Sequence, residues 1–180
     1  MHGLTEIVQR HPSIILDIRY ATKNNFLGRP LYSSARCFLV QATAERLYRV
    51  SAALEQCKLG LKVFDGYRPL LVQKKFWSIL PDPRYFADPA VGSNHNRGAA
   101  VDLTLVDEWG IELLMPSGFD EMTERSHRNY QGGPAQALAH RSILEEAMGQ
   151  EGFVGCPTEW WHFDDPDWAR YPILDIPIEA

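Results

Sequence analysis

The stretch that organises this 180-residue chain reads Gly98-Ala99-Ala100-Val101-Asp102-Leu103-Thr104-Leu105-Val106. Its apolar and β-prone composition predicts a strand, and Asp102 then lies within that strand. The segment from Ile111 to Met115 is typical of a hairpin partner, and Trp109-Gly110 supplies a turn between the two. Further strands are predicted over residues 13–20, 61–64, 152–154 and 158–163.

Three helices are predicted between these strands. The first runs from Ala42 to about Gln56, where apolar residues recur at three- and four-residue steps. Pro69 opens the second helix, which stops before Pro81. A third helix, over residues 134–149, opens at a proline and is closed by a glycine. Because helices and antiparallel hairpins occupy separate blocks, we expect an α+β fold with a small curved, mainly antiparallel sheet and flanking helices.

Composition narrows the class of protein. A chain of this length with 45% hydrophobic residues suits a single domain over residues 1–180. The net charge of −5, without any basic stripe, argues against a nucleic-acid partner. The sequence has neither a secretory leader pattern nor an apolar run of about 20 residues, so we expect a soluble, cytoplasmic protein without membrane contact. Cys37, Cys57 and Cys156 are widely spaced, which predicts reduced and buried thiols.

Two imidazoles and a carboxylate form a candidate metal site. Catalytic zinc usually takes three protein ligands and leaves a fourth position for water. His95, Asp102 and His162 supply such a set, and the small residues between His95 and Asp102 let the chain fold both onto one centre. The alternative is that His95 is a solvated loop histidine and Asp102 a turn-facing carboxylate.

Glu159 stands three residues before His162 and is a candidate general base for a metal-activated water. An ideal strand would send these two side chains to opposite faces. We therefore predict a bulge or bend at Trp160-Trp161 that turns both toward one site. Each tryptophan also has a simpler interpretation as a core aromatic.

A third cluster reads Asp65-Gly66-Tyr67-Arg68-Pro69, where a strand ends and a helix begins. Arg68 is placed to project into a cleft. Its guanidinium would stay charged at any working pH, and it would stabilise an oxyanion or bind a substrate carboxylate. The alternative is a surface arginine that pairs with Asp65.

These clusters together resemble the zinc D-alanyl-D-alanine dipeptidase family, the VanX type. The His95-to-Asp102 and Glu159-to-His162 motifs also occur in a wider group of peptidoglycan-cleaving peptidases. Narrower motifs support the dipeptidase, and they extend over nearly the whole chain: Arg19-Tyr20-Ala21-Thr22, Asn25-Phe26-Leu27-Gly28, Asp65-Gly66-Tyr67-Arg68-Pro69, Phe119-Asp120 and Glu124-Arg125-Ser126-His127.

The resemblance implies hydrolysis of D-alanyl-D-alanine to two D-alanines, with one zinc ion per chain. It implies that His95, Asp102 and His162 bind the zinc, that Glu159 is the general base and acid, and that Arg68 stabilises the tetrahedral intermediate. By the same resemblance, the residues that help to hold the dipeptide are Ser93, Asp120 and Tyr20. The chain departs from the family pattern in a short connection between Pro81 and Val91 and in Asn94, both of which bear on selectivity.

Two other functions remain open on the sequence. One is a related peptidoglycan D,D- or L,D-carboxypeptidase or endopeptidase, which would share the metal site but have an open groove. The other is a zinc-stabilised binding module that has lost catalysis, against which the presence of both Glu159 and Arg68 argues. The sequence has no heptad pattern or interface stripe, and it leaves the oligomeric state open.

Overall fold

A five-stranded sheet forms the centre of the fold in the computed structural model, with strand order β2-β4-β5-β7-β6. Its members are β2 (Ile14–Leu16), β4 (Leu59–Asp65), β5 (Ala100–Asp107), β6 (Val154–Gly155) and β7 (His162–Asp164). Only β2 and β4 pair in parallel, so the expected mainly antiparallel α+β sheet is confirmed. The structure describes residues 3–179, and the ends of the expected domain, residues 1–2 and 180, lie outside the described residues.

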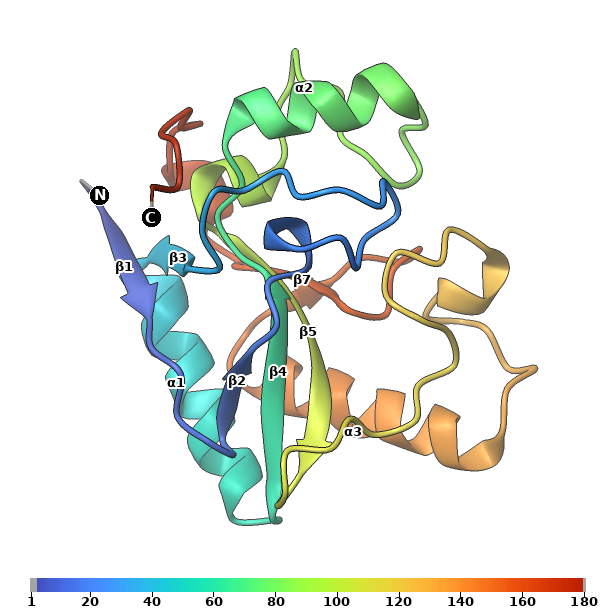
Figure 1. Cartoon of the computed structure of the whole chain (residues 1–180). Coiled ribbons are helices and arrows are strands. Elements are labelled where there is room, and N and C mark those ends of the chain that lie inside the picture. The colour runs from blue at the N-terminus through green and yellow to red at the C-terminus, as the bar shows by residue number, and fades with distance from the viewer. Residues whose placement is uncertain (1–2, 180) are drawn as a thin grey trace.

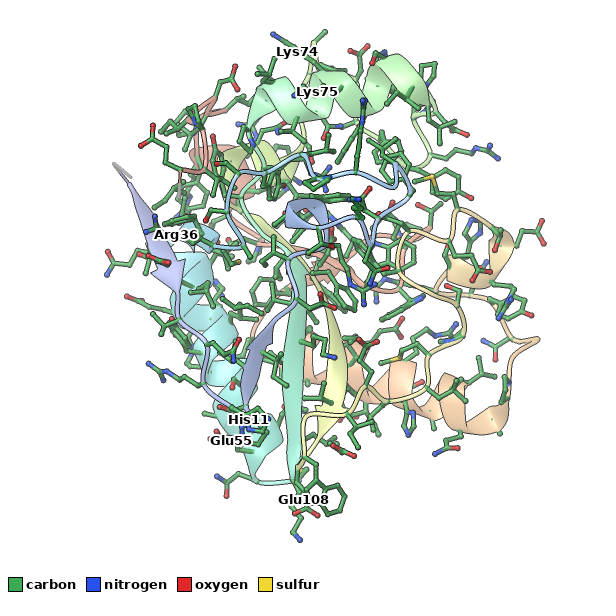
Figure 2. All side chains as sticks on the ribbon, viewed as in Figure 1. His11, Arg36, Glu55, Lys74, Lys75 and Glu108 are labelled. Carbon is green, nitrogen blue, oxygen red and sulfur yellow. The ribbon has the colours of Figure 1, made fainter. Side chains whose placement is uncertain are left out.

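Three helices flank this sheet: α1 (Gln41–Glu55), α2 (Leu70–Ile79) and α3 (Ala135–Gln150). Figure 1 shows α1 and α3 behind the sheet, while the segment over residues 17–36 crosses in front of it and α2 lies above. In Figure 2, Lys74 and Lys75 project outward from α2, and Glu108 lies beyond the lower end of β5. The predicted helices are therefore present, each within two residues of its expected bounds.

A second sheet of two strands, β1 (Leu4–Ile7) and β3 (Cys37–Val40), was not predicted. All four residues of β3 are buried, so it has no alternation for a sequence pattern to detect. Within residues 3–179 the structure also has four short 3-10 helices: η1 (Arg19–Ala21), η2 (Asn94–Arg97), η3 (Glu124–Ser126) and η4 (Trp168–Arg170). The second of these carries His95.

Several predicted boundaries were wrong. The strand expected over residues 13–20 ends at Leu16, and its last residues form η1. The expected hairpin partner over residues 111–115 makes only a single bridge, between Val106 and Glu112, because the chain then leaves the sheet. The third helix continues through Gly149, and the chain turns at Gly152, which has the positive φ of 84°. The strand expected over residues 152–154 is β6, shifted to residues 154–155.

A bulge in β4 positions the residues at the end of the sheet. Val63 pairs with Leu103, but the next pair joins Asp65 to Asp102, so Phe64 is an extra residue in the strand. An inserted residue re-aims the side chains that follow it. Asp65 therefore lies directly beside Asp102, which in turn pairs with His162 on β7.

The bend expected at Trp160-Trp161 is present. The predicted strand over residues 158–163 does not begin until His162, and the His162 amide donates to the Glu159 carbonyl at 3.4 Å across a turn. Trp160 and Trp161 are 2% and 1% exposed, and both therefore belong to the core. Burying two indole rings fixes this turn against the sheet.

Two further expectations concern the burial of the cysteine thiols and the absence of a membrane-spanning helix. The three thiols are free, as expected, but only Cys37 is buried, whereas Cys57 is exposed and Cys156 is half-buried. The two exceptions lie in loops after α1 and β6, where the packing is incomplete. Among the described residues, no helix has the length and apolar character needed to cross a membrane.

Candidate metal centre and active site

Three side chains converge at the upper end of the sheet, of which two are buried and that of His162 is half-buried. His95 comes from η2, Asp102 from β5 and His162 from the first residue of β7. The His162 Nδ1 atom lies 3.0 Å from both His95 Nε2 and Asp102 Oδ1, and His95 Nε2 lies 3.3 Å from that same oxygen. One ligand atom from each residue falls within 4.8 Å of the others. The alternative of a solvated His95 is wrong, because this residue is 2% exposed.

The outer nitrogen of each imidazole has a fixed partner. His95 Nδ1 lies 2.7 Å from the Gly66 carbonyl oxygen, and His162 Nε2 lies 2.9 Å from Asp164 Oδ1. Such contacts orient a metal-ligating histidine and make it a stronger ligand. They leave His95 Nε2 and His162 Nδ1 directed at each other and at Asp102.

The charges in this cluster favour a cation at its centre. Burial opposes the negative charge on Asp102, yet His95 and His162 together hold the pKa of that carboxyl well below its usual range. Burial likewise opposes a charge on His162, but Asp164 and Asp102 raise its pKa well above its ordinary value. The positive charge of protonated His162 lies between the carboxylates of Asp164 and Asp102. A metal cation bound in this cluster could neutralise the same negative charge. Two imidazole nitrogens and one carboxylate oxygen suit zinc.

Glu159 faces the same cluster from the turn before β7. Its Oε2 atom lies 3.9 Å from His162 Nδ1, so the bend at the tryptophans brings the two side chains to one side. Burial raises the pKa of Glu159 to about 8, against the opposing charge of His162. A carboxyl group with this pKa can both accept and return a proton near neutral pH.

Arg68 is held in the interior by three side chains. Its Nε and Nη2 atoms bond Asp65 Oδ2 at 3.0 and 2.9 Å, and Nη1 donates to Gln73 at 2.9 Å. The Asp102 Oδ2 atom is 3.7 Å away. The ion pair with Asp65 is therefore present, but Arg68 is 5% exposed and not the surface arginine of the alternative interpretation.

Sequence reasoning named Asp65 only as the partner of a surface Arg68, and it missed Gln73 and Tyr32, which complete the support of this arginine. Asp65 is fully buried, and Tyr32 donates to its Oδ1 at 2.8 Å. Burial raises the pKa of Asp65, while Arg68 opposes that rise. Gln73 in turn donates to the Ala87 carbonyl, at the edge of the cavity. The position of Asp65 three residues before Arg68 was the only signal in the sequence.

Asp120 and Tyr20 meet across 100 positions of sequence. The Tyr20 hydroxyl donates to Asp120 Oδ2 at 2.9 Å. Asp120 has a left-handed backbone with φ of 58°, and burial together with the charge of Asp102 raises its pKa to about 7. Ser93 caps η2, and its hydroxyl accepts from the His95 amide at 3.2 Å.

All eight residues assigned to the site from the sequence line one cavity of about 40 Å³. The short connection between Pro81 and Val91 also reaches it, through Tyr85, Phe86 and Ala87. Asn94 does not line it and faces a neighbouring groove. The cavity thus brings together a metal-ligand cluster, a carboxyl group of raised pKa, a buried guanidinium and a second carboxylate.

Comparisons with known proteins agree with this arrangement. A family model described as D-ala-D-ala dipeptidase matches residues 1–177. The D-alanyl-D-alanine dipeptidase of Escherichia coli is 41% identical, over 97% of this chain and 92% of that protein. Proteins of the same description from Enterococcus faecium and Streptomyces coelicolor are 31% and 33% identical, over 91% and 90% of this chain and 92% and 91% of their own lengths. The match extends over nearly the whole chain, and the protein belongs to the D-Ala-D-Ala dipeptidase family of metallopeptidases.

Proposed function

We propose that residues 1–180 form a single zinc dipeptidase domain that hydrolyses D-alanyl-D-alanine to two D-alanines. The observation that carries this proposal is the small cavity in which the ligand cluster, Glu159, Arg68 and Asp120 face one another. The names of the relatives, each a D-alanyl-D-alanine dipeptidase, support the same substrate.

His95, Asp102 and His162 would hold one zinc ion. Their two nitrogens and one oxygen match the donor set of catalytic zinc, and the Gly66 carbonyl and Asp164 orient the two rings. Zinc bound there would supply Lewis acidity, which lowers the pKa of water and polarises a carbonyl group.

Glu159 would act as the general base and then as the general acid. It takes a proton from the attacking water, and it later gives a proton to the leaving amine of the second D-alanine. Its buried position and its pKa of about 8 support both roles, because the protonated and ionised forms then have similar free energies near neutral pH.

Arg68 would bind the negative charge that develops on the reacting carbonyl group, and Asp120 would bind the positive charge of the substrate ammonium group. The buried guanidinium of Arg68 stabilises the oxyanion of the tetrahedral intermediate, and Asp65 and Gln73 hold it in place. Asp120 pairs with the substrate ammonium group, with Tyr20 fixing the carboxylate by its hydroxyl and Ser93 lining the same cavity.

Two alternatives have less support. A peptidoglycan carboxypeptidase or endopeptidase needs an open groove for a longer peptide, whereas this cavity is small and is bounded by residues 85–87. A binding module without catalysis would have no use for a carboxyl group of raised pKa beside the cluster.

Hydrolysis of D-alanyl-D-alanine by the purified protein, with and without a chelator, tests the proposal. We expect D-alanine release that stops on chelation and returns with added zinc. Glu159→Ala should keep its zinc but lose turnover by several orders of magnitude, since proton transfer in both directions is removed. Glu146→Ala, at an exposed position on α3, is the matched control and should turn over normally. Near-normal turnover in Glu159→Ala would contradict the assignment, and cleavage of longer peptides alone would favour the carboxypeptidase.

A further inference from the structure

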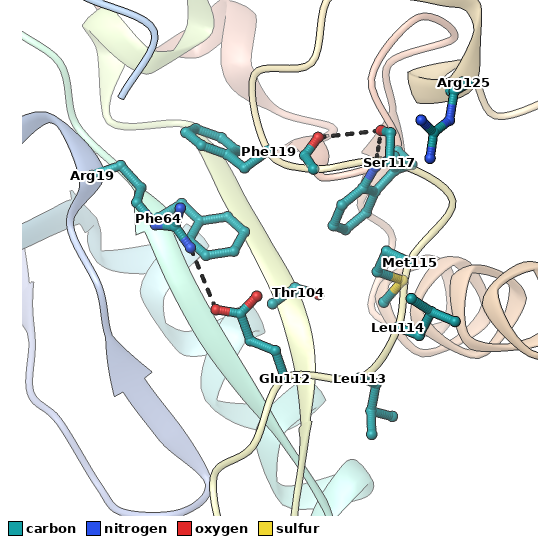
Figure 3. A pocket seen from close by; sticks show the side chains of 12 residues that line it. Arg19, Phe64, Thr104, Glu112, Leu113, Leu114, Met115, Ser117, Phe119 and Arg125 are labelled. Carbon is teal, nitrogen blue, oxygen red and sulfur yellow. Dashed lines mark hydrogen bonds and ion pairs between the residues drawn. The ribbon is translucent and has the colours of Figure 1, made fainter. Parts of the chain in front are cut away.

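A second and much larger cavity, of about 460 Å³, adjoins the active site (Figure 3). Thr104 lies at its floor, on the same face of β5 as Asp102, because residues two apart in a strand point the same way. The proposed catalytic role does not use this cavity, although it is an order of magnitude larger than the 40 Å³ cavity beside it.

Adjacent residues of the same chain segments line the two cavities. Phe64 lines the large cavity, and the next residue, Asp65, holds Arg68 at the active site. Phe119 lines the large cavity, and the next residue, Asp120, lines the active site. Trp160 and Trp161 divide in the same way. Neighbouring residues of the same segments therefore face two different cavities, and these segments, with their side chains, form the partition between the cavities.

Phe119 stands in the middle of this partition. Its ring centroid lies 4.7 Å from that of Phe64, which belongs to the large cavity. On the other side it lies 5.4 Å from Trp161 and 6.1 Å from Tyr20, both of which line the active site. Figure 3 shows the Phe119 ring beside Phe64 at the edge of the large cavity.

We propose that Phe119 is a specificity-determining residue: its ring closes the active site off from the large cavity and thereby restricts the substrate to small side chains. This inference rests on the proposed dipeptidase function. A side chain larger than methyl would have to enter the space that the ring occupies. With the ring removed, the 40 Å³ and 460 Å³ cavities would join.

The lining of the large cavity suits an apolar side chain. Leu113, Met115 and Trp160 supply apolar walls, and the guanidinium groups of Arg19 and Arg125 lie at opposite sides. Arg19 is already neutralised by Asp17 at 2.8 Å and contacts Glu112 at 3.4 Å. An aromatic or branched aliphatic group entering from the active site would therefore meet an apolar surface and no unpaired buried charge.

The test measures kcat/KM of wild type and Phe119→Ala, as zinc-loaded proteins, on two series of dipeptides. One series is D-Ala-D-Xaa and the other D-Xaa-D-Ala, where Xaa is alanine, valine, leucine or phenylalanine. Each methylene in a pocket changes specificity by about 10- to 200-fold. We expect the ratio of phenylalanine to alanine substrates to rise by at least about tenfold in one series.

Phe26→Ala is the matched control, because Phe26 packs on Tyr20 at 6.5 Å without lining the large cavity. It should leave the ratio unchanged. Phe119→Leu carries the same test if the alanine variant does not fold, as judged by circular dichroism. An unchanged ratio in a folded Phe119 variant, or an equal rise in Phe26→Ala, would overturn the inference. Absence of wild-type turnover on D-alanyl-D-alanine would instead contradict the proposed function on which it rests.

Discussion

Replacing Arg68 by methionine should separate the structural role of this residue from its proposed catalytic role. Methionine has a similar length but no charge, so it leaves the carboxylate of Asp65 buried without its cation. Asp65 then loses two contacts, at 3.0 and 2.9 Å, and keeps the 2.8 Å hydrogen bond from Tyr32 and the His95 Nδ1 atom at 3.9 Å.

The expected loss of stability in Arg68→Met follows from the burial of the Asp65–Arg68 ion pair. Both side chains are at most 6% exposed, so water does not replace the lost partner. Removing one member of a buried ion pair costs about 3–5 kcal/mol. The loss of an oxyanion-stabilising group should also lower kcat by about 10²- to 10³-fold.

A second substitution separates these two losses. The double variant Asp65→Asn/Arg68→Met removes both charges, and it should regain most of the free energy of unfolding, because a neutral amide can still bond the Tyr32 hydroxyl. Its turnover should stay as low as that of Arg68→Met, because no cation remains at the oxyanion.

Urea unfolding followed by tryptophan fluorescence gives the stability, and D-alanine release gives kcat. An Arg68→Met variant that loses less than about 1 kcal/mol would refute the buried-pair reasoning. Recovery of turnover in the double variant would refute the role of Arg68 in stabilising charge, since activity would then follow stability alone.

Two further predictions concern carboxylates around the cavity. Asp164→Asn should weaken zinc binding by about 10- to 100-fold in a chelator competition, because the Asp164 carboxylate orients His162 at 2.9 Å. The control, Asp107→Asn at the far end of β5, should bind zinc as the wild type does. Equal zinc affinities of the two variants would contradict this prediction. In the zinc-free protein, Asp120 has a folded pKa of about 7, above the unfolded value of about 3.9. Between these two pH values the native state binds one proton more than the unfolded state. The contribution of Asp120 to the free energy of unfolding therefore falls as the pH rises from about 4 to 7. Asp120→Asn should flatten that part of a pH series of urea unfolding curves, and an unchanged slope would show that Asp120 does not titrate there.

Much of the fold could be predicted because its signals are local. Apolar residues at helical spacing gave α1, and prolines at the starts of α2 and α3 set their first turns. The strand β5 was predicted from a continuous apolar run. By contrast, β1 and β3 escaped prediction, since four residues carry too little periodicity. The hairpin after β5 was overestimated because only one bridge forms.

The bend at Trp160-Trp161 is a structural feature that a short stretch of sequence was enough to predict. The need for Glu159 and His162 to face one centre conflicts with strand alternation, and this conflict predicted the turn that the structure contains. The identity of the residues that support Arg68 gave no comparable conflict, so Gln73 and Tyr32 were missed.

The sequence by itself determined the chemical groups and their short-range order: two histidines and an aspartate at metal-ligand spacing, a glutamate three residues from a ligand, and an arginine before a helix. Only the tertiary structure decided the distances between segments far apart in the chain. The bulge at Phe64 sets Asp65 beside Asp102, and the packing of η1 against the loop that carries Asp120 places Tyr20 on that carboxylate. Such contacts depend on strand register and on side-chain packing over the whole core, which short sequence patterns do not encode.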